Sequence, residues 1–180
     1  TLLGARPKRG KSWMMLGCAV AVAGGGVAMG ARCDEGDVLG LFLEDNRRRL
    51  NSRMATLMGD TPWPSRLTFF TLENGWPRLD EGGLERIDRW IESVARPRLV
   101  IVDVLTKVRP KGDKNRNPYE HDYEALKGLT ELASRKRIAI VAVHHCRKTP
   151  ADEDPFDELS GTTGLTGAAN TTLVLKRGEG

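Results

Sequence analysis

A phosphate-binding pattern lies near the start of the chain. Residues 5–12 read Ala-Arg-Pro-Lys-Arg-Gly-Lys-Ser, the spacing of a glycine-rich Walker A loop with alanine in place of the first glycine. Backbone N–H groups of such a loop surround a β-phosphate, and the positive end of the next helix points at the same anion. Lys11 is expected to reach the β- and γ-phosphates, and Ser12 to ligate Mg²⁺. The predicted nucleotide-binding residues are Ala5, Arg6, Pro7, Lys8, Arg9, Gly10, Lys11, Ser12 and Trp13. The alternative is an ordinary basic loop between a strand and a helix.

Two further segments supply carboxylates that nucleotide hydrolysis needs. Leu99–Val102 is an apolar run followed by Asp103, which fits a Walker B acid that helps Ser12 to hold Mg²⁺. Glu44 follows another apolar run and is the candidate group that orients or deprotonates the attacking water. The alternative for Glu44 and Asp45 is that both acids cap the helix beginning near Asn46.

A histidine pair follows a third apolar run. His144 or His145 could hydrogen-bond a γ-phosphate and so sense its presence. The pair could instead be packing or surface residues, or metal ligands. Because the neighbouring residues offer one cysteine, Cys146, and one further histidine, His121, a zinc site is disfavoured.

The elements that must position these residues alternate along the chain. Apolar strands separated by helices predict an α/β fold, with a mostly parallel sheet covered on both faces. The expected strands are Thr1–Gly4, Val38–Leu43, Leu67–Leu72, Leu99–Val102, Ile138–Val143 and Thr171–Leu175. The expected helices are Lys11–Ala23, 46–58, a segment with Leu84, Ile87, Ile91 and Val94 that Pro97 closes, and a segment from Asn117 and Pro118 to Ser134. Residues 107–117 and 151–167 are expected to be irregular.

Helical spacing also predicts which side chains of two helices face inward. In the helix over 46–58 these are Leu50, Met54 and Leu57, and Gly59 ends the helix. In the helix that follows Pro118 they are Tyr119, Tyr123, Leu126 and Leu129.

Charge is concentrated in two short segments. The chain has 28 basic and 24 acidic residues, and residues 6–11 and 107–116 together hold nine of the basic ones and one acid, which leaves 19 basic against 23 acidic elsewhere. The first segment is the phosphate loop. The second contains Lys111, Lys114 and Arg116, whose charge suits phosphates of ATP or of a nucleic acid strand. A solvated surface loop is the alternative.

The composition bounds the class of protein. With 180 residues, 39% hydrophobic and 29% charged, the chain is long enough for one domain with a real core. We expect a single domain over 1–180, truncated at one or both ends because the chain opens Thr-Leu-Leu-Gly. The uncharged run Trp13–Met29 contains Gly17 and Gly24–Gly26, so we interpret it as a buried helix and not a membrane span. Three scattered cysteines fit a reducing, cytoplasmic setting.

Taken together, these segments resemble the RecA-type ATPase fold, and within it the RepA-like hexameric helicases, relatives of the DnaB helicases. The resemblance rests on residues 4–13, Leu41-Phe-Leu-Glu-Asp45, Leu99–Asp103, Val143–Lys148 and 160–177, which occur in the family's order. It implies ATP and Mg²⁺ as ligands, a homo-hexameric ring and single-stranded DNA as the partner. It also implies that the strand Ile138–Val143 lies between the strands carrying the Walker A and Walker B residues.

The same resemblance assigns roles to particular residues. Glu44 matches the family's catalytic carboxylate, and His144 or His145 its γ-phosphate sensor. Lys176 and Arg177 match basic fingers that reach a neighbouring subunit's ATP. The leading hypothesis is therefore the ATP-hydrolysing motor domain of a replicative helicase. The alternatives are a recombinase or circadian-type RecA relative, an ATP-dependent regulator without unwinding activity, and a DNA-binding module without enzymatic activity.

Overall fold

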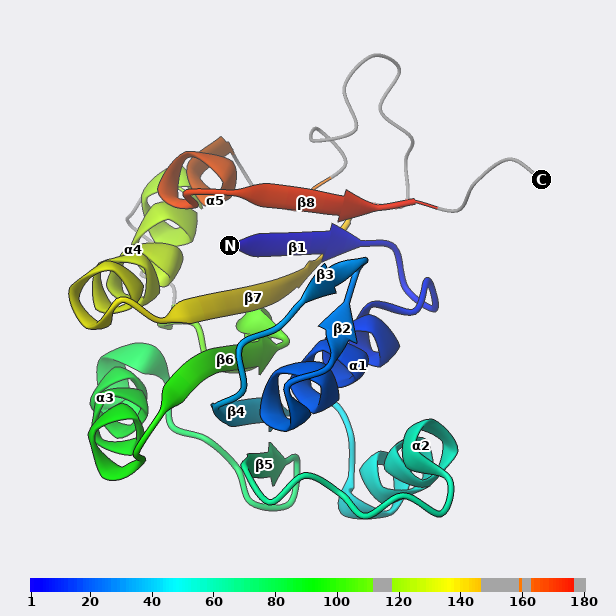
Figure 1. The fold of residues 1–180 in the computed structure, drawn as a ribbon. Helices are drawn as coiled ribbons and strands as arrows, with labels where there is room; N and C mark the ends of the chain where they lie inside the picture. Colours follow the sequence, from blue (N-terminus) through cyan, green and yellow to red (C-terminus); the bar gives the residue numbers. More distant parts are fainter. Residues whose placement is uncertain (112–117, 147–158, 160–162, 177–180) are drawn as a thin grey trace.

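Six parallel strands form the central sheet of the computed structural model (Figure 1). The structure describes residues 1–111, 118–146, 159 and 163–176. The strands are β1 (Leu2–Ala5), β4 (Asp37–Phe42), β5 (Leu67–Thr71), β6 (Pro97–Asp103), β7 (Ala139–His145) and β8 (Thr172–Leu175). Their order is β5-β4-β6-β7-β1-β8. The parallel sheet and the predicted place of β7, between β1 and β6, are confirmed.

Helices cover both faces of this sheet. They are α1 (Lys11–Gly24), α2 (Arg47–Met58), α3 (Gly83–Ser93), α4 (Pro118–Lys136) and α5 (Thr163–Ala168), with short 3₁₀ turns η1 (Leu79–Glu81) and η2 (Leu105–Lys107). Figure 1 shows α1 and α2 on one side of the sheet and α3 and α4 on the other. The predicted α/β architecture with two covered faces is therefore confirmed.

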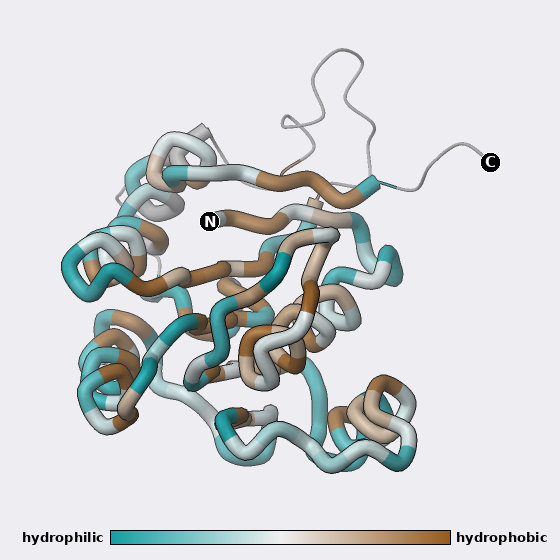
Figure 2. The backbone as a smooth tube through the Cα atoms, viewed as in Figure 1, coloured by the Kyte–Doolittle hydropathy of each residue, from teal (hydrophilic) through white to brown (hydrophobic). Residues whose placement is uncertain are grey.

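Alternating side chains of each strand feed two separate cores. In β6, Val100 and Val102 pack with α3 and α4, whereas Leu99 and Ile101 pack with α1 and α2. This alternation follows from the pleat of a strand, which points successive side chains to opposite faces. Because both faces are covered, the strands are apolar at nearly every position, as Figure 2 shows along the sheet.

Three expectations about individual residues are wrong. Leu57 and Tyr123 are 40% and 36% exposed, although their spacing predicts inward positions. The inward face of α2 runs through Leu50, Met54 and Met58, so Leu57 lies to one side of it. Pro97 does not close α3, which ends at Ser93; it is the first residue of β6, a strand position that tolerates proline. The side chain of Tyr119 lies outside the described residues.

A small hairpin and a short helix occur where the sequence predicts neither. After α1 ends at Gly24, the strands β2 (Val27–Ala28) and β3 (Ala31–Arg32) form a small antiparallel hairpin. The helix α5 occupies the end of the stretch 151–167, which the sequence predicts to be irregular, and extends to Ala168. In the described part of the chain, no helix combines the length and apolarity needed to cross a bilayer.

Candidate active site

The phosphate loop joins the end of β1 to the start of α1. Ala5 is the last residue of β1, fully buried and extended, so this position does not need the conformational freedom of glycine. Gly10, by contrast, has a φ of 87° and begins α1 in the left-handed region, where a side chain would be strained. A glycine also offers no side-chain cap, so the first-turn N–H groups of α1 remain available to an anion.

A pocket of about 400 Å³ opens beside this loop, at the carboxyl edge of the sheet. One wall consists of Pro7, Lys8, Gly10, Lys11, Ser12 and Trp13. The other consists of Glu44, Asp45, Arg49, Arg53 and His145. Lys11, Ser12, Glu44 and His145, predicted from separate segments, therefore meet in one cavity. Ligands of open parallel sheets bind at this edge.

Strand register brings these residues together. Phe42 of β4 is paired with Asp103 of β6, and Asp103 with Val143 of β7. Glu44 and His145 each lie two residues beyond this row, on β4's exit and on β7. Their side chains meet, with His145 Nε2 3.5 Å from Glu44 Oε1. His144 is 3% exposed and lies opposite Gly4 of β1, so the structure brings His145 and not His144 to the pocket wall.

Asp103 lies at the base of the site and is 2% exposed. Burial raises the pKa of its carboxyl above 3.8, and the hydrogen bond with Ser12 and the charge of Lys11 oppose that rise. Among the described residues, Asp103 Oδ1 has no hydrogen-bond partner. A buried carboxylate oxygen without a hydrogen-bond partner, next to a serine hydroxyl, is suited to bind a hard cation such as Mg²⁺ or its bound water. Ser12 and Asp103 are thus the residues suited to hold the metal.

Asp45 does not cap α2 as the alternative interpretation proposed. Asn46 does so, since its Oδ1 accepts a hydrogen bond from Arg49 N–H at 2.8 Å. The Asp45 carboxylate is 4% exposed and lies between two guanidinium groups, with Arg49 Nε 3.3 Å from Oδ1 and Arg53 bonded to Oδ2. The Arg53 guanidinium also lies 5.7 Å from the centre of the Trp13 ring.

Arg49 and Arg53 are pocket residues that the sequence analysis missed. Their signal is the four-residue spacing of Asp45, Arg49 and Arg53, which places the two arginines on the face of α2 that lies above Asp45. This spacing becomes informative only once Asp45, the second acid beside Glu44, is expected to need cationic partners.

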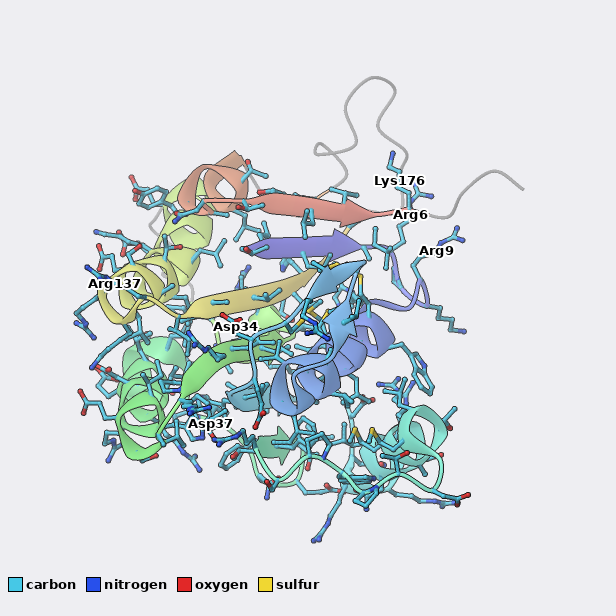
Figure 3. The ribbon with its side chains drawn as sticks, viewed as in Figure 1. Arg6, Arg9, Asp34, Asp37, Arg137 and Lys176 are labelled. Carbon is cyan, nitrogen blue, oxygen red and sulfur yellow. The ribbon has the colours of Figure 1, made fainter. Side chains whose placement is uncertain are left out.

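Several predicted residues lie apart from the pocket lining. Figure 3 shows Arg6, Arg9 and Lys176 together at the carboxyl ends of β1 and β8. Lys111 is 75% exposed, and its Nζ is 4.0 Å from Glu81 Oε1. Lys114, Arg116 and Arg177 lie outside the described residues.

The fold and this pocket define a nucleotide-binding P-loop ATPase domain of the RecA type. Residues 1–151 match the family model AAA_25, described as an AAA domain, and the chain belongs to that family. No curated protein sequence matches it.

Two solved structures show the same fold. "ATPase Domain of G40P" matches with a TM-score of 0.68 and 13% identity, over 98% of this chain and 68% of that one. "The Structure Of A DnaB-Like Replicative Helicase And Its Interactions With Primase" matches with a TM-score of 0.70 and 13% identity, over 98% of this chain and 46% of that one. The chain therefore spans less than half of the second protein.

Proposed function

We propose that this chain is the Mg²⁺-dependent, ATP-hydrolysing motor domain of a DnaB-like replicative helicase that acts on single-stranded DNA. The observation that carries the proposal is the meeting of the phosphate loop, the Ser12–Asp103 pair and the Glu44–His145 pair at one sheet edge. A nucleotide-binding protein without hydrolysis would need the first of these features but not a carboxylate facing the end of the phosphate chain.

Each residue has a chemical task in this proposal. Lys11 binds the β- and γ-phosphates, while the N-terminus of α1 binds the phosphate chain. Glu44 is 43% exposed, so water reaches its carboxylate, which orients the water or accepts its proton during attack on the γ-phosphorus. His145, beside Glu44, is the proposed sensor of the γ-phosphate. Mg²⁺ held by Ser12 and Asp103 would neutralise phosphate charge.

The remaining assignments concern partners. We propose that residues 1–180 form one domain and that its copies assemble into a hexameric ring. Lys176, exposed at the end of β8, and Arg177 would then reach the ATP of a neighbouring subunit. Lys111, Lys114 and Arg116 would contact the phosphates of the DNA strand.

Separating binding from hydrolysis tests the site. Glu44→Gln should bind ATP like the wild type but lower the rate of hydrolysis at least about 100-fold, because it removes the base and leaves the phosphate loop intact. Lys11→Ala should weaken binding itself. Calorimetric titration with ATP and a phosphate-release assay measure the two effects.

Two exposed positions supply matched controls for this test. Glu131→Gln and Lys127→Ala change the same residue types on α4, which packs against the opposite face of the sheet. Both variants should leave ATP binding and hydrolysis at the wild-type level. A wild-type rate of hydrolysis by Glu44→Gln would refute the assignment of Glu44. Unchanged ATP affinity of Lys11→Ala would refute the proposed nucleotide site.

A further inference from the structure

The two arginines that flank Asp45 differ in how firmly they are held. The side chain of Arg53 is 13% exposed, is bonded to Asp45 and lies over Trp13. The side chain of Arg49 is 63% exposed and is held through the 3.3 Å contact between its Nε and Asp45 Oδ1. Because the Arg49 side chain is mostly exposed, water can solvate its guanidinium when it leaves, and the buried Asp45 carboxylate is still paired with Arg53. Asp45 would keep Arg53 as its partner when Arg49 moves.

Arg49 also lines the pocket in which the proposed nucleotide would bind. It belongs to the pocket wall that carries Glu44, opposite the phosphate loop. Since Lys11 reaches the β- and γ-phosphates from the loop, the phosphate that faces Glu44 is the γ-phosphate. The guanidinium of Arg49 is one turn of helix from Asp45 and can turn from that carboxylate towards the pocket interior.

The charge of α2 favours an anion at this position. Arg47, Arg48 and Arg49 occupy its first turn, which contains no acid. Cations are unfavourable at a helix N-terminus, because the macrodipole is positive there. Asp45 and the bond from Arg47 N–H to Glu73 Oε2 offset part of this charge. A phosphate group in the pocket would offset more of this positive charge. It would also accept a charge-assisted, bidentate hydrogen bond from Arg49.

We propose that the Arg49 guanidinium leaves Asp45 and binds the γ-phosphate when ATP is present. This exchange lets the domain distinguish ATP from ADP within a single subunit. This inference rests on the proposed nucleotide site. It differs from the trans fingers Lys176 and Arg177, because Arg49 acts on the nucleotide bound by its own chain. Arg53 stays on Asp45 and holds α2 in place during the exchange.

The affinities of Arg49→Ala for AMP-PNP and ADP test this exchange. Calorimetric titration should show AMP-PNP binding weakened roughly ten-fold or more, since a hydrogen bond between charged groups is lost, while ADP binding stays within about two-fold of wild type. Arg49→Lys keeps the charge without the planar fork and should fall between the two. Arg48→Ala is the matched control, because Arg48 is an exposed neighbour on the same turn outside the pocket lining.

The outcomes separate this inference from the proposed function. If Arg49→Ala leaves both affinities unchanged, or weakens AMP-PNP and ADP equally, while the wild type binds both nucleotides, the exchange is refuted and the nucleotide site stands. If the wild type and Arg48→Ala bind neither nucleotide, the proposed site fails and the inference fails with it.

Discussion

Two carboxylates with opposite surroundings define the site at the scale of single residues. Asp103 is buried beneath the pocket, and burial raises the pKa of its carboxyl. Glu44 is open to solvent and faces His145. When one acid of a cleft has a shifted pKa and the other is exposed to solvent, the two typically perform different tasks. Here the buried acid suits the holding of a cation, and the exposed one suits work on water.

The raised pKa of Asp103 makes the stability of the free domain depend on pH. Because the folded state holds the proton more tightly than the unfolded state, the stabilisation by protonated Asp103 is lost as pH rises through the raised pKa. At neutral pH, Asp103→Asn should therefore be more stable than the wild type by roughly 1 kcal/mol, since it removes a buried charge. The difference should shrink as pH falls towards the raised pKa.

Urea unfolding of both proteins at neutral and mildly acidic pH measures this difference. Asp80→Asn changes an exposed aspartate and serves as the control, with equal stability expected at both pH values. A difference between Asp103→Asn and wild type that stays constant with pH, or that favours the wild type at neutral pH, would contradict the account of Asp103.

Local patterns predicted Lys11, Ser12, Glu44 and Asp103, because each follows a recognisable strand end or loop. They could not predict the ion pairs of Asp45, since these depend on how deeply the exit of β4 is buried. Nor could they separate His144 from His145. The alternation of a strand sends one histidine inward and the other to the pocket, and only the register fixes which.

At the scale of elements, the position of β4 depends on a glycine that makes room for aromatic rings. Phe42 and Phe69 pack edge to face, with centroids 5.6 Å apart. A Cβ at Gly40 would lie 2.6 Å from Phe42 Cε2 and 2.7 Å from Phe69 Cδ1. The strand that leads to Glu44 therefore packs closely against β5 only because residue 40 has no side chain.

Gly40→Ala should consequently destabilise the domain by about 1–3 kcal/mol, because the two rings must shift within a packed core. Gly17→Ala is a matched change in the middle of α1, where an added Cβ meets nothing within 4 Å. It should raise stability by up to about 1 kcal/mol through helix propensity. Denaturant midpoints of the two variants measure both effects, and a neutral or stabilising Gly40→Ala would show that β4 and β5 are less closely packed than described.

The sequence predicted the long elements well and the hairpin β2–β3 not at all. Its strands have two residues each, too few for a pattern, and its turn consists of Met29 and Gly30 with φ of 50° and 79°. A two-residue turn in which both residues are left-handed usually has the sequence Asn-Gly, which makes it recognisable. With methionine in the first position, the segment resembles a continuation of the apolar helix before it.

At the scale of the whole molecule, the carboxyl edge of the sheet collects the residues of the proposed site. Residues at the ends of β1, β4 and β7 line the pocket, and Asp103 at the end of β6 is hydrogen-bonded to Ser12. Lys176 follows β8 at the same edge. The second basic segment, residues 107–116, begins at the last residue of η2 and includes the exposed Lys111. Residues outside the two basic segments have a small acidic excess, so the net positive charge of the chain comes from these two segments.

The central claim is that ATP hydrolysis in this domain is coupled to single-stranded DNA. Phosphate release by the wild type, measured with and without single-stranded DNA, tests it most directly. We predict that single-stranded DNA raises the rate of phosphate release roughly several-fold. Neutralising Lys111, Lys114 and Arg116 should remove this stimulation and leave ATP binding unchanged. A wild-type rate that is the same with and without DNA would contradict the motor assignment and favour an ATP-dependent regulator.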